Sequence, residues 1–518
     1  MSVSSRAAAR PAAAIVLAAG GGTRMRSSTS KMLHEIGGRS LVGHALAAVD
    51  QLDPEHLSVV VRAHADQVGP HVAALAPRAE VVEQDDVYGT GRAVWCAMGA
   101  LPASVRDGVV VVTSGDVPLL TADTLRDLVD SHAREHNAVT ALTAMVDDPT
   151  GYGRIIRAQT GGVLGIVEQR DASPKQQRLR EINSGIYAFD GHVLADALDQ
   201  LTPTNTQGEW YLTDVLAIVA GHGHRVGAVV TDDVWQTEGV NDRAQLATLR
   251  RVLNERLARA WMLDGVTIVD PATTWIDVDV RLAPDVVLEP NTQLRGTTAV
   301  EVGAHLGPDT TLVDCTVGAG AVVVRAHGVG ARIGERVSVG PYVSMRPGTQ
   351  LGVGSKLGTF VETKNAVLGA GAKVPHLSYA GDVTIGEGTN VGAGVIFANY
   401  DGVAKYSSTV GKHAFVGSDS VVVAPRTIAD GAYIAAGSTV VSDVGPGELA
   451  VGRGKQRNIA GWVSRKLPGT RTHAAATEAA EAAEEAAAAT GAPGDSAGVR
   501  RLDDDDASGA ATAAGGAS

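Results

Sequence analysis

The feature that most constrains this fold is an aliphatic side chain at every sixth position in the second half of the chain. Because six is even, a strand with alternating side chains keeps all of these residues on one face. A short fixed period with Gly or Ala nearby indicates a coil of short parallel strands, the hexapeptide β-helix. An amphipathic helix would instead need a period near 3.6. The repeat comprises Ile333, Val339, Met345, Leu351 and Leu357, and then Val410, Val416, Val422, Ile428, Ile434 and Val440.

The first half alternates short apolar runs with helix-like stretches. The runs are residues 15–17, 57–61, 109–112, 139–146 and 186–189, and the helix-like stretches include 41–49 and 121–132, where Thr121 is a candidate N-cap. This alternation predicts a largely parallel sheet covered by helices on both faces. Such sheets bind ligands at the carboxyl ends of their strands.

Changes of composition divide the chain into five segments. We expect a flexible extension at 1–12, the α/β half at 13–241, a linker helix at 242–265, the β-helix at 266–462 and a disordered Ala/Glu/Asp-rich tail at 463–518. The linker prediction depends on leucines that step by three or four residues before Gly265. Transient helix is expected within the tail at 474–489.

Composition narrows the possible partners. The chain carries 44 Lys+Arg against 57 Asp+Glu, a formal charge of −13, which argues against a nucleic acid partner. Cys96 and Cys315 lie far apart in different halves, which argues against a disulfide framework and indicates a reducing, cytoplasmic location. Apolar runs stay well short of the roughly 20 residues that a membrane span requires, so no membrane partner is expected.

A glycine-rich loop follows the first apolar run. Residues 17–25 read Leu-Ala-Ala-Gly-Gly-Gly-Thr-Arg-Met, and Lys31 follows. Small residues let backbone N–H groups approach an anion, and Arg24 and Lys31 add positive charge. The loop matches neither the P-loop nor the G-x-G-x-x-G pattern, since Met25 stands where the last Gly should be. Taken alone, a tight strand-to-helix turn would explain it equally well.

Polar residues at later strand ends strengthen the case for a nucleotide site. Gln84 offers an amide that could pair with a base edge, and Gly89-Thr90 forms a second small-residue loop. Asp116 ends an all-valine run and is a natural Mg²⁺ ligand, although a turn or helix cap is the alternative. Gly153, Glu168, Asn183 and Asn241 supply further polar groups, each of which alone is more often a turn or cap residue.

In combination these residues resemble the sugar-1-phosphate nucleotidylyltransferase (pyrophosphorylase) family. With the hexapeptide half attached, residues 13 to about 460 resemble the bacterial bifunctional uridylyltransferase/acetyltransferase family that makes UDP-N-acetylglucosamine for peptidoglycan. The resemblance implies an α/β fold: a Rossmann-like mixed sheet followed by a left-handed parallel β-helix. Three positions depart from the family: Ser30 replaces a usual Pro, Arg92 a usual His, and Ser114 a frequent Tyr.

The resemblance also implies roles in uridylyl transfer. UTP would be held by Leu17, Ala18, Ala19, Gly20, Lys31, Gln84, Gly89 and Thr90, with Arg24 and Lys31 acting on the phosphates. Asp116 and Asn241 would hold Mg²⁺, and N-acetylglucosamine would contact Gly153, Glu168 and Asn183. Attack of the sugar phosphate on the α-phosphorus needs alignment and charge neutralisation more than a protein nucleophile.

Interruptions of the six-residue period are the expected place for chemistry in the β-helix, because the scaffold itself is inert. Between Leu357 and Ile385 one interruption contains Lys364, His376 and Tyr379, and a second contains Asn399 and Tyr400. Acetyl transfer to an amine needs a base, a donor for the oxyanion and charge to hold a sugar phosphate. Histidine suits the first role near neutral pH.

For this half the resemblance implies that His376 is the general base. It implies a glucosamine-1-phosphate site at Arg346, Lys364, Tyr379 and Asn390, and an acetyl-CoA site at Ala393, Asn399, Tyr400, Ser418, Ala436 and Arg453. For Arg346 and Arg453 the alternative is a solvated surface charge, and for Ser418 and Ala436 it is packing within the repeat. Coils of this kind commonly form trimers, so a homotrimer is expected.

Two other functions remain open at this point. One is a single-activity nucleotidylyltransferase that uses the coil for trimerisation, which would not need the group Lys364, His376, Tyr379 and Asn390. The other is a non-catalytic regulatory subunit, which predicts loss of charged ligands, yet Lys31, Asp116, Asn241 and His376 are all present.

Overall fold

The computed structural model describes residues 10–489. The described residues divide after Gly452 into two compact units, which are described separately. The expected extension therefore falls mostly, and the end of the expected tail wholly, outside the described residues. Within residues 10–489, no helix combines the length and the apolar character that crossing a membrane requires.

A mixed sheet forms the first half, in the order β11-β7-β10-β6-β1-β4-β5. All neighbours pair in parallel except β10, which runs antiparallel to β6 and β7. The predicted apolar runs all lie on these strands. The bounds are β1 Ala13–Ala18, β4 His56–Val61, β5 Glu80–Glu83, β6 Val109–Ser114, β7 Val139–Met145, β10 Glu181–Asp190 and β11 Val226–Thr231, and β8 Arg154–Arg157 and β9 Val163–Val167 add a side hairpin.

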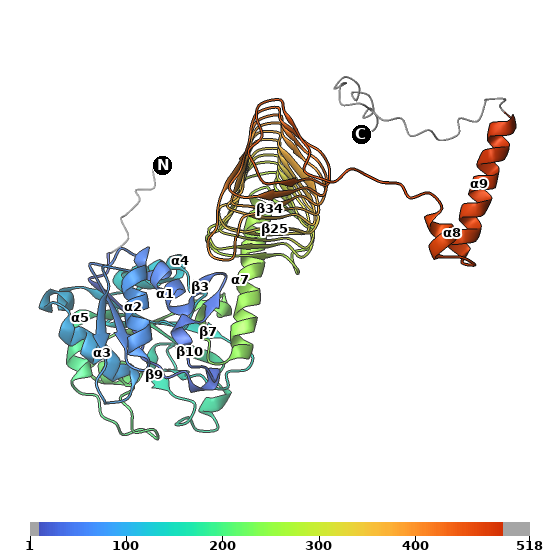
Figure 1. Cartoon of the computed structure of the whole chain (residues 1–518). Helices are drawn as coiled ribbons and strands as arrows, with labels where there is room; N and C mark the ends of the chain where they lie inside the picture. The colour runs from blue at the N-terminus through green and yellow to red at the C-terminus, as the bar shows by residue number, and fades with distance from the viewer. Residues whose placement is uncertain (1–9, 490–518) are drawn as a thin grey trace, which may run out of the picture. The chain divides into compact units, whose positions relative to one another are not determined.

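Helices cover both faces of this sheet, as the sequence predicts (Figure 1). One buried cluster joins the sheet to α3 (Thr90–Ala100), α5 (Gly191–Leu198) and α6 (Asp214–Gly221). The other joins it to α1 (Leu41–Asp50), α2 (Ala65–Leu75) and α4 (Ala122–Glu135). The predicted cap of α4 is confirmed, since Thr121 Oγ1 accepts a hydrogen bond from Thr124 N at 3.3 Å.

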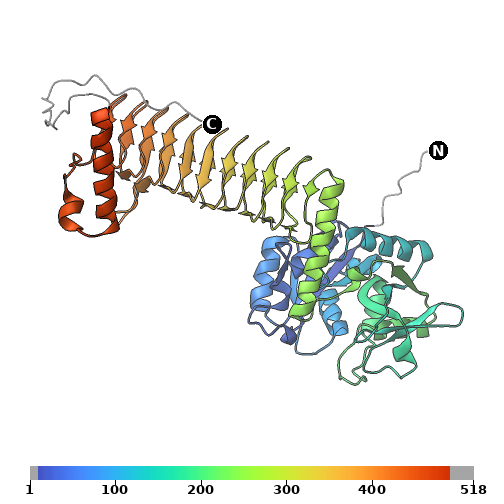
Figure 2. The same cartoon turned by 90° about the vertical axis from the view of Figure 1, so that its right-hand side faces the viewer.

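The predicted β-helix is confirmed, and its coils stack one above another (Figure 2). In the described part of the chain three parallel sheets of 11, 10 and 9 strands form its sides. Val410 pairs with Ile428, three six-residue periods later, and Val416 pairs with Ile434 in the same way. One coil is therefore three hexapeptides. All eleven repeat residues are at most 5% exposed. The sheets begin at β12 (Thr267–Ile268), β13 (Trp275–Ile276) and β14 (Arg281–Leu282) and end at β41 (Leu449–Ala450), β40 (Thr439–Val440) and β38 (Thr427–Ile428).

The two interruptions of the period differ in structure. In the first the coil continues, because Leu357 pairs with Val374 one residue short of three periods, and Thr363 and Ala380 are buried at the inward positions. In the second, Ile385 pairs with Val410 seven residues beyond three periods. The second interruption is therefore an inserted loop, which contains residues 399–406.

Helix α7 (Arg243–Leu263) connects the two halves, as predicted. Asp242 caps its first turn, and Gly265 follows its end with φ of 95°. Leu246 and Leu249 are buried against the sheet half. In the second unit, helices α8 (Trp462–Lys466) and α9 (Arg471–Ala489) contain no buried residue, and they lie where the sequence predicts a disordered tail with transient helix.

Candidate active sites

Two adjoining cavities open at the carboxyl ends of β1 and β6. The chain runs outward from β1 through β4 to β5 on one side and reaches β6 on the other, so strand order reverses here. Ligands of open α/β sheets bind at such a point. The first cavity, of about 670 Å³, is lined by Ala19, Gly20, Lys31, Gln84 and Gly89. The second, of about 540 Å³, is lined by Arg24, Gly153, Glu168, Asn183 and Asn241, and both share Leu17, Thr90, Ser114 and Asp116.

Lys31 and Asp116 form a buried ion pair where the two cavities meet. Their side chains are 9% and 14% exposed, and Lys31 Nζ donates to Asp116 Oδ2. The glycine loop folds tightly around the lysine: Gly22 has φ of 57°, and a Cβ there would lie 2.7 Å from Lys31 Cβ. Ser30, at the position where the family usually has Pro, caps the short turn Lys31–Leu33 through its hydroxyl. The loop therefore presents a fixed ammonium group to the first cavity, beside Asp116, which lines both.

Gln84 shapes the second small-residue loop. Its amide Nε2 donates to Val87 O at 2.8 Å and to Gly89 O at 3.1 Å. These bonds fix the orientation of the amide, whose oxygen remains as an acceptor for a base N–H. Gly89 has φ of 125°, and a Cβ there would lie 2.2 Å from Trp210 O. Only glycine fits this approach of two backbones.

Arg92 supports the same loop from helix α3. Its guanidinium Nη2 and Nε lie 2.5 Å and 2.9 Å from Asp85 Oδ2. The guanidinium carbon lies 4.0 Å from the Trp95 ring centroid and 5.4 Å from that of Trp210. The hydrogen bonds from Arg92 lower the pKa of Asp85, so the pair stays charged. The departure from the family's histidine thus adds an ion pair that fastens residue 85 to α3.

The second cavity contains the residues expected to hold a sugar. Asn183 Oδ1 accepts hydrogen bonds from Gly185 N at 3.2 Å and Tyr187 OH at 2.9 Å, beside a register shift in β10. Burial raises the pKa of Glu168, the Thr213 hydroxyl opposes the rise, and nearby carboxylates add to it. A partly buried acceptor of this kind suits the hydroxyl groups of a sugar.

Three expected residues need separate mention. Asn241 follows Gly239, which lies against Asp116, and Val240 N donates to Asp116 O at 2.9 Å. Asn241 thus lies beside the expected partner ligand. Arg24 lines the second cavity rather than the first. Ala18 is fully buried in the core beneath the sheet and lines neither cavity.

On the β-helix, four expected residues recur at one corner of successive coils. Backbone bonds run from Gly394 N to His376 O at 3.2 Å, from Asp419 N to Ala393 O at 2.7 Å, and from Gly437 N to Ser418 O at 2.7 Å. His376, Ala393, Ser418 and Ala436 each immediately precede a turn residue of this ladder. His376, Ser418 and Ala436 are exposed. Such a column gives an extended ligand a continuous edge.

A polar network surrounds Asp382, which directly follows β31 (Tyr379–Gly381). Its Oδ1 accepts from Asn365 Nδ2 at 2.8 Å, its Oδ2 accepts from Asn399 Nδ2, and Lys364 Nζ lies 3.8 Å from Oδ2. Burial alone would raise the pKa of Asp382, but these amides and the lysine lower it below its usual value. Asp382 therefore remains an anion that orients Lys364 and Asn399.

Tyr379 lies within this network. The position of a Cβ on Gly381 would fall 2.4 Å from Tyr379 OH, so the ring folds over a glycine. Asn399 Nδ2 reaches Tyr379 OH at 3.4 Å. Both residues belong to the side formed by β28 (Glu362–Lys364), β31 (Tyr379–Gly381) and β34 (Ile396–Ala398) or its following loop. His376 ends β30 (Lys373–His376), and Asn390 begins β33 (Asn390–Val391), which pairs with β30 on the neighbouring side.

Lys405 is a further site residue that the sequence patterns did not indicate. It lies in the inserted loop, and its contact with Lys364 lowers the pKa of Lys405, an effect to which Arg346 adds. Arg346 also lies 3.2 Å from Glu362. Lys364, Lys405 and Arg346 therefore lie near enough for their charges to interact, and such a group of cations suits a phosphate. Lys405 lies five residues after Tyr400, within the second interruption of the period. This position is the signal that could have identified it.

The last two residues expected to hold acetyl-CoA are Tyr400 and Arg453, and the backbone of Tyr400 pairs with that of Lys405 in the cation group. Tyr400 is 58% exposed in the inserted loop, and its hydroxyl donates to Gly402 O at 2.6 Å. Arg453 is an exposed residue at the start of the second unit.

Known proteins match this chain over most of its length. Residues 14–179 match the MobA-like NTP transferase domain family. A bifunctional GlmU protein of Kineococcus radiotolerans is 56% identical over 90% of this chain and 95% of its own length, and one of Streptomyces coelicolor is 55% identical over 90% and 97%. One of Mycolicibacterium gilvum is 52% identical over 90% and 94%. These matches span the sheet, the linker helix and the β-helix together, so the chain belongs to the family of bifunctional GlmU proteins.

Proposed function

We propose that this chain makes UDP-N-acetylglucosamine in two steps on two separate sites. Acetyl transfer from acetyl-CoA to glucosamine-1-phosphate takes place on the β-helix, and uridylyl transfer from UTP takes place in the paired cavities of the sheet half. The observation that carries this division is the presence of two unlike charged sites in one chain: Lys31 with Asp116, and Lys364 with Lys405 and Asp382. Membership of the bifunctional family supports the same pair of reactions.

In uridylyl transfer the protein aligns two anions. A phosphate oxygen of N-acetylglucosamine-1-phosphate attacks the α-phosphorus of UTP, and pyrophosphate leaves. The Gln84 amide oxygen accepts from the base, which suits uracil because its N3 carries a proton. Glu168 and Asn183 hold the sugar, and Lys31 neutralises phosphate charge between the two cavities. Positioning and charge neutralisation of this kind supply most of what a phosphoryl-type transfer requires.

Magnesium fits the donor set at the cavity edge. Asp116 offers a carboxylate and Asn241 a carboxamide oxygen that accepts no hydrogen bond from the described residues. Mg²⁺ is commonly bound by one or two such oxygens together with substrate phosphates. When bound there, the ion would neutralise phosphate charge and hold the triphosphate in line.

In acetyl transfer His376 removes the proton from the ammonium group of glucosamine-1-phosphate. The free amine attacks the thioester carbonyl carbon, the C–S bond breaks, and the proton that the nitrogen loses as the amide forms goes to the departing thiolate, so coenzyme A leaves as the thiol. Lys364, Lys405 and Arg346 hold the sugar phosphate, and Asn399 and Tyr379 act as donors to the carbonyl oxygen. Acetyl-CoA lies along the column of Ala393, Ser418 and Ala436, with Tyr400 as a further contact.

The direct test is to incubate the purified chain with acetyl-CoA, glucosamine-1-phosphate, UTP and Mg²⁺. UDP-N-acetylglucosamine, coenzyme A and pyrophosphate are the expected products, and EDTA should abolish formation of UDP-N-acetylglucosamine and pyrophosphate while coenzyme A release continues. Uridylyl transfer without acetyl transfer would favour a single-activity nucleotidylyltransferase. Absence of both reactions would favour a regulatory subunit.

The Arg92–Asp85 pair is expected to affect UTP binding rather than chemistry. Arg92→Ala frees the loop that carries Gly89 and should raise KM for UTP about fivefold, with kcat little changed, given the modest strength of partly exposed ion and cation–π pairs. Arg92→Lys should restore little, because lysine cannot form the same planar contacts. Arg106→Ala, an exposed arginine of the same half, is the control. An unchanged KM for UTP in Arg92→Ala would contradict this role.

We also propose that the chain works as a cytoplasmic homotrimer. Three turn residues at one corner of the coil, Tyr342, Phe360 and Leu377, are between 54% and 60% exposed and form an apolar edge. Exposed apolar groups of this kind commonly mark contact surfaces. Light scattering of the purified chain would give the mass of the assembly. We also propose that the segments of the chain meet at residues 12, 241, 265 and 462. Limited proteolysis, which cuts most readily between folded segments, would test these boundaries.

A further inference from the structure

The segment 233–241 contributes Thr237, Gly239 and Asn241 to the lining of the second cavity. Glu238 Oε2 accepts a hydrogen bond from Tyr152 OH at 2.6 Å, which ties the segment to the loop before Gly153. Val240 N donates to Asp116 O at 2.9 Å, and Asn241 ends the segment. Thr237 is 2% exposed and lines the cavity. The sugar edge and the proposed metal edge therefore both depend on where this short segment lies.

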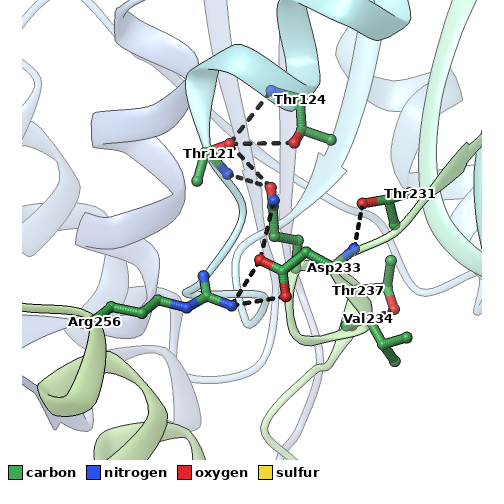
Figure 3. A network of polar contacts seen from close by, with 8 residues as sticks. Thr121, Thr124, Thr231, Asp233, Val234, Thr237 and Arg256 are labelled. Carbon is green, nitrogen blue, oxygen red and sulfur yellow. Dashed lines mark hydrogen bonds and ion pairs between the residues drawn. The ribbon is translucent and has the colours of Figure 1, made fainter. Parts of the chain in front are cut away.

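Arg256 fastens the start of this segment to the linker helix α7. Its Nη2 lies 2.8 Å from Asp233 Oδ1 and 2.7 Å from Oδ2, and Figure 3 shows the guanidinium reaching across to this carboxylate. Gln236 continues the network: its Nε2 donates to Asp233 Oδ2 at 3.3 Å. Its Oε1 accepts from Thr121 N and Thr121 Oγ1, both at 3.0 Å. Thr121 caps α4, so the network connects α7, the segment and α4.

This network matters more for geometry than for stability. The side chains of Arg256 and Asp233 are 33% and 37% exposed, and ion pairs that water reaches contribute little to folding. The two contacts from Arg256 Nη2 to the carboxylate oxygens nevertheless fix the distance between α7 and Asp233. The segment is a short turn, Val234–Thr237, followed by irregular backbone, which opens easily when its anchors are removed.

We propose that Arg256 is a positioning residue for uridylyl transfer. Through Asp233 and Gln236 it fixes the segment that presents Asn241 to Asp116 and Glu238 to Tyr152. The inference rests on the proposed roles of Asn241 and Asp116. It adds that the helix leading into the β-helix also sets the geometry of the nucleotide site.

Substitution on α7 separates positioning from general destabilisation. Arg256→Ala should lower kcat/KM of uridylyl transfer about tenfold and raise the Mg²⁺ concentration for half-maximal rate, because small displacements at a reacting centre are costly. Acetyl transfer by the same sample should be unchanged, which reports an intact chain. Arg251→Ala is the matched control: Arg251 pairs with Glu255 at 2.6 Å on the same helix, with both side chains about 60% exposed. Asp233→Ala should match Arg256→Ala, and the double variant should be no worse than either.

Hydrogen exchange gives a readout that needs neither metal nor nucleotide. Amides of residues 234–241 should exchange about fivefold faster or more in Arg256→Ala than in the wild type, with no such change in Arg251→Ala. Exchange and uridylyl transfer like those of Arg251→Ala would overturn the inference, as would equal loss of both activities or additive effects in the double variant. A wild-type chain without uridylyl transfer would overturn the proposed function instead, and exchange would then decide the anchoring separately.

Discussion

Lys31→Ala is expected to lower kcat/KM for UDP-N-acetylglucosamine formation about a hundredfold to a thousandfold, the usual effect of removing a preorganised charge from a transition state. The Lys31 ammonium lines the first cavity and lies against Asp116, which both cavities share, so we expect it to neutralise charge on the UTP phosphates. Acetyl transfer should be unchanged, because the β-helix residues do not depend on this lysine. Pyrophosphate release and coenzyme A release, measured on one preparation, check both statements.

A control must separate lost charge from lost stability. Removing Lys31 leaves the Asp116 side chain, only 14% exposed, without its cation, and breaking a buried ion pair costs about 3–5 kcal/mol. Lys31→Met keeps most of the side-chain volume, and its Tm beside that of Lys31→Ala measures the packing contribution. Lys175→Ala, an exposed lysine of the same half, should leave both reactions unchanged. Uridylyl transfer within threefold of wild type in Lys31→Ala would show that the lysine is not needed.

The fold could be predicted because its signals are local and periodic. Three hexapeptides make one coil, so the aliphatic period alone sets the register in which Val410 lies over Ile428. Where the aliphatic pattern lapses, the coil continues with Thr363 and Ala380 at the buried inward positions. Small and hydroxyl side chains fill those positions without being counted as apolar. The period therefore predicts the scaffold well, but it predicts a break between Leu357 and Ile385 where the coil in fact continues.

The candidate site residues could be predicted where they lie at an edge of the sheet or in an interruption of the six-residue period. Gly20 and Asp116 follow the ends of β1 and β6, and Asn183 lies near the beginning of the antiparallel β10, so all three reach the same edge of the sheet. Lys405 and the Arg256–Asp233 pair were not predicted, because each depends on a partner far along the chain. Contacts between charges on separate elements leave no periodic trace in the sequence. They become visible only once the sheet, the linker helix and the coil are in place.

The second large effect is expected at His376. His376→Ala should lower kcat of acetyl transfer about a hundredfold to ten-thousandfold, the range that a positioned general base contributes. KM for glucosamine-1-phosphate should change little, because Lys364, Arg346 and Lys405 hold the phosphate. Uridylyl transfer to supplied N-acetylglucosamine-1-phosphate should be unchanged. Coenzyme A release from acetyl-CoA and glucosamine-1-phosphate gives the rate.

The position of His376 makes this variant a clean test. The residue is exposed at a corner of the coil, outside the buried column of Val374 and Ala380, so its loss should change the free energy of unfolding by no more than about 0.5 kcal/mol. His413→Ala is the matched control, since His413 is an exposed histidine at another corner of the same β-helix. Both variants should have the Tm of the wild type, while only His376→Ala loses acetyl transfer. If coenzyme A release in His376→Ala equals that in His413→Ala, a group other than His376 must accept the proton from the amine. Asp382 and Tyr379, which both contact Asn399, then become the residues to replace next.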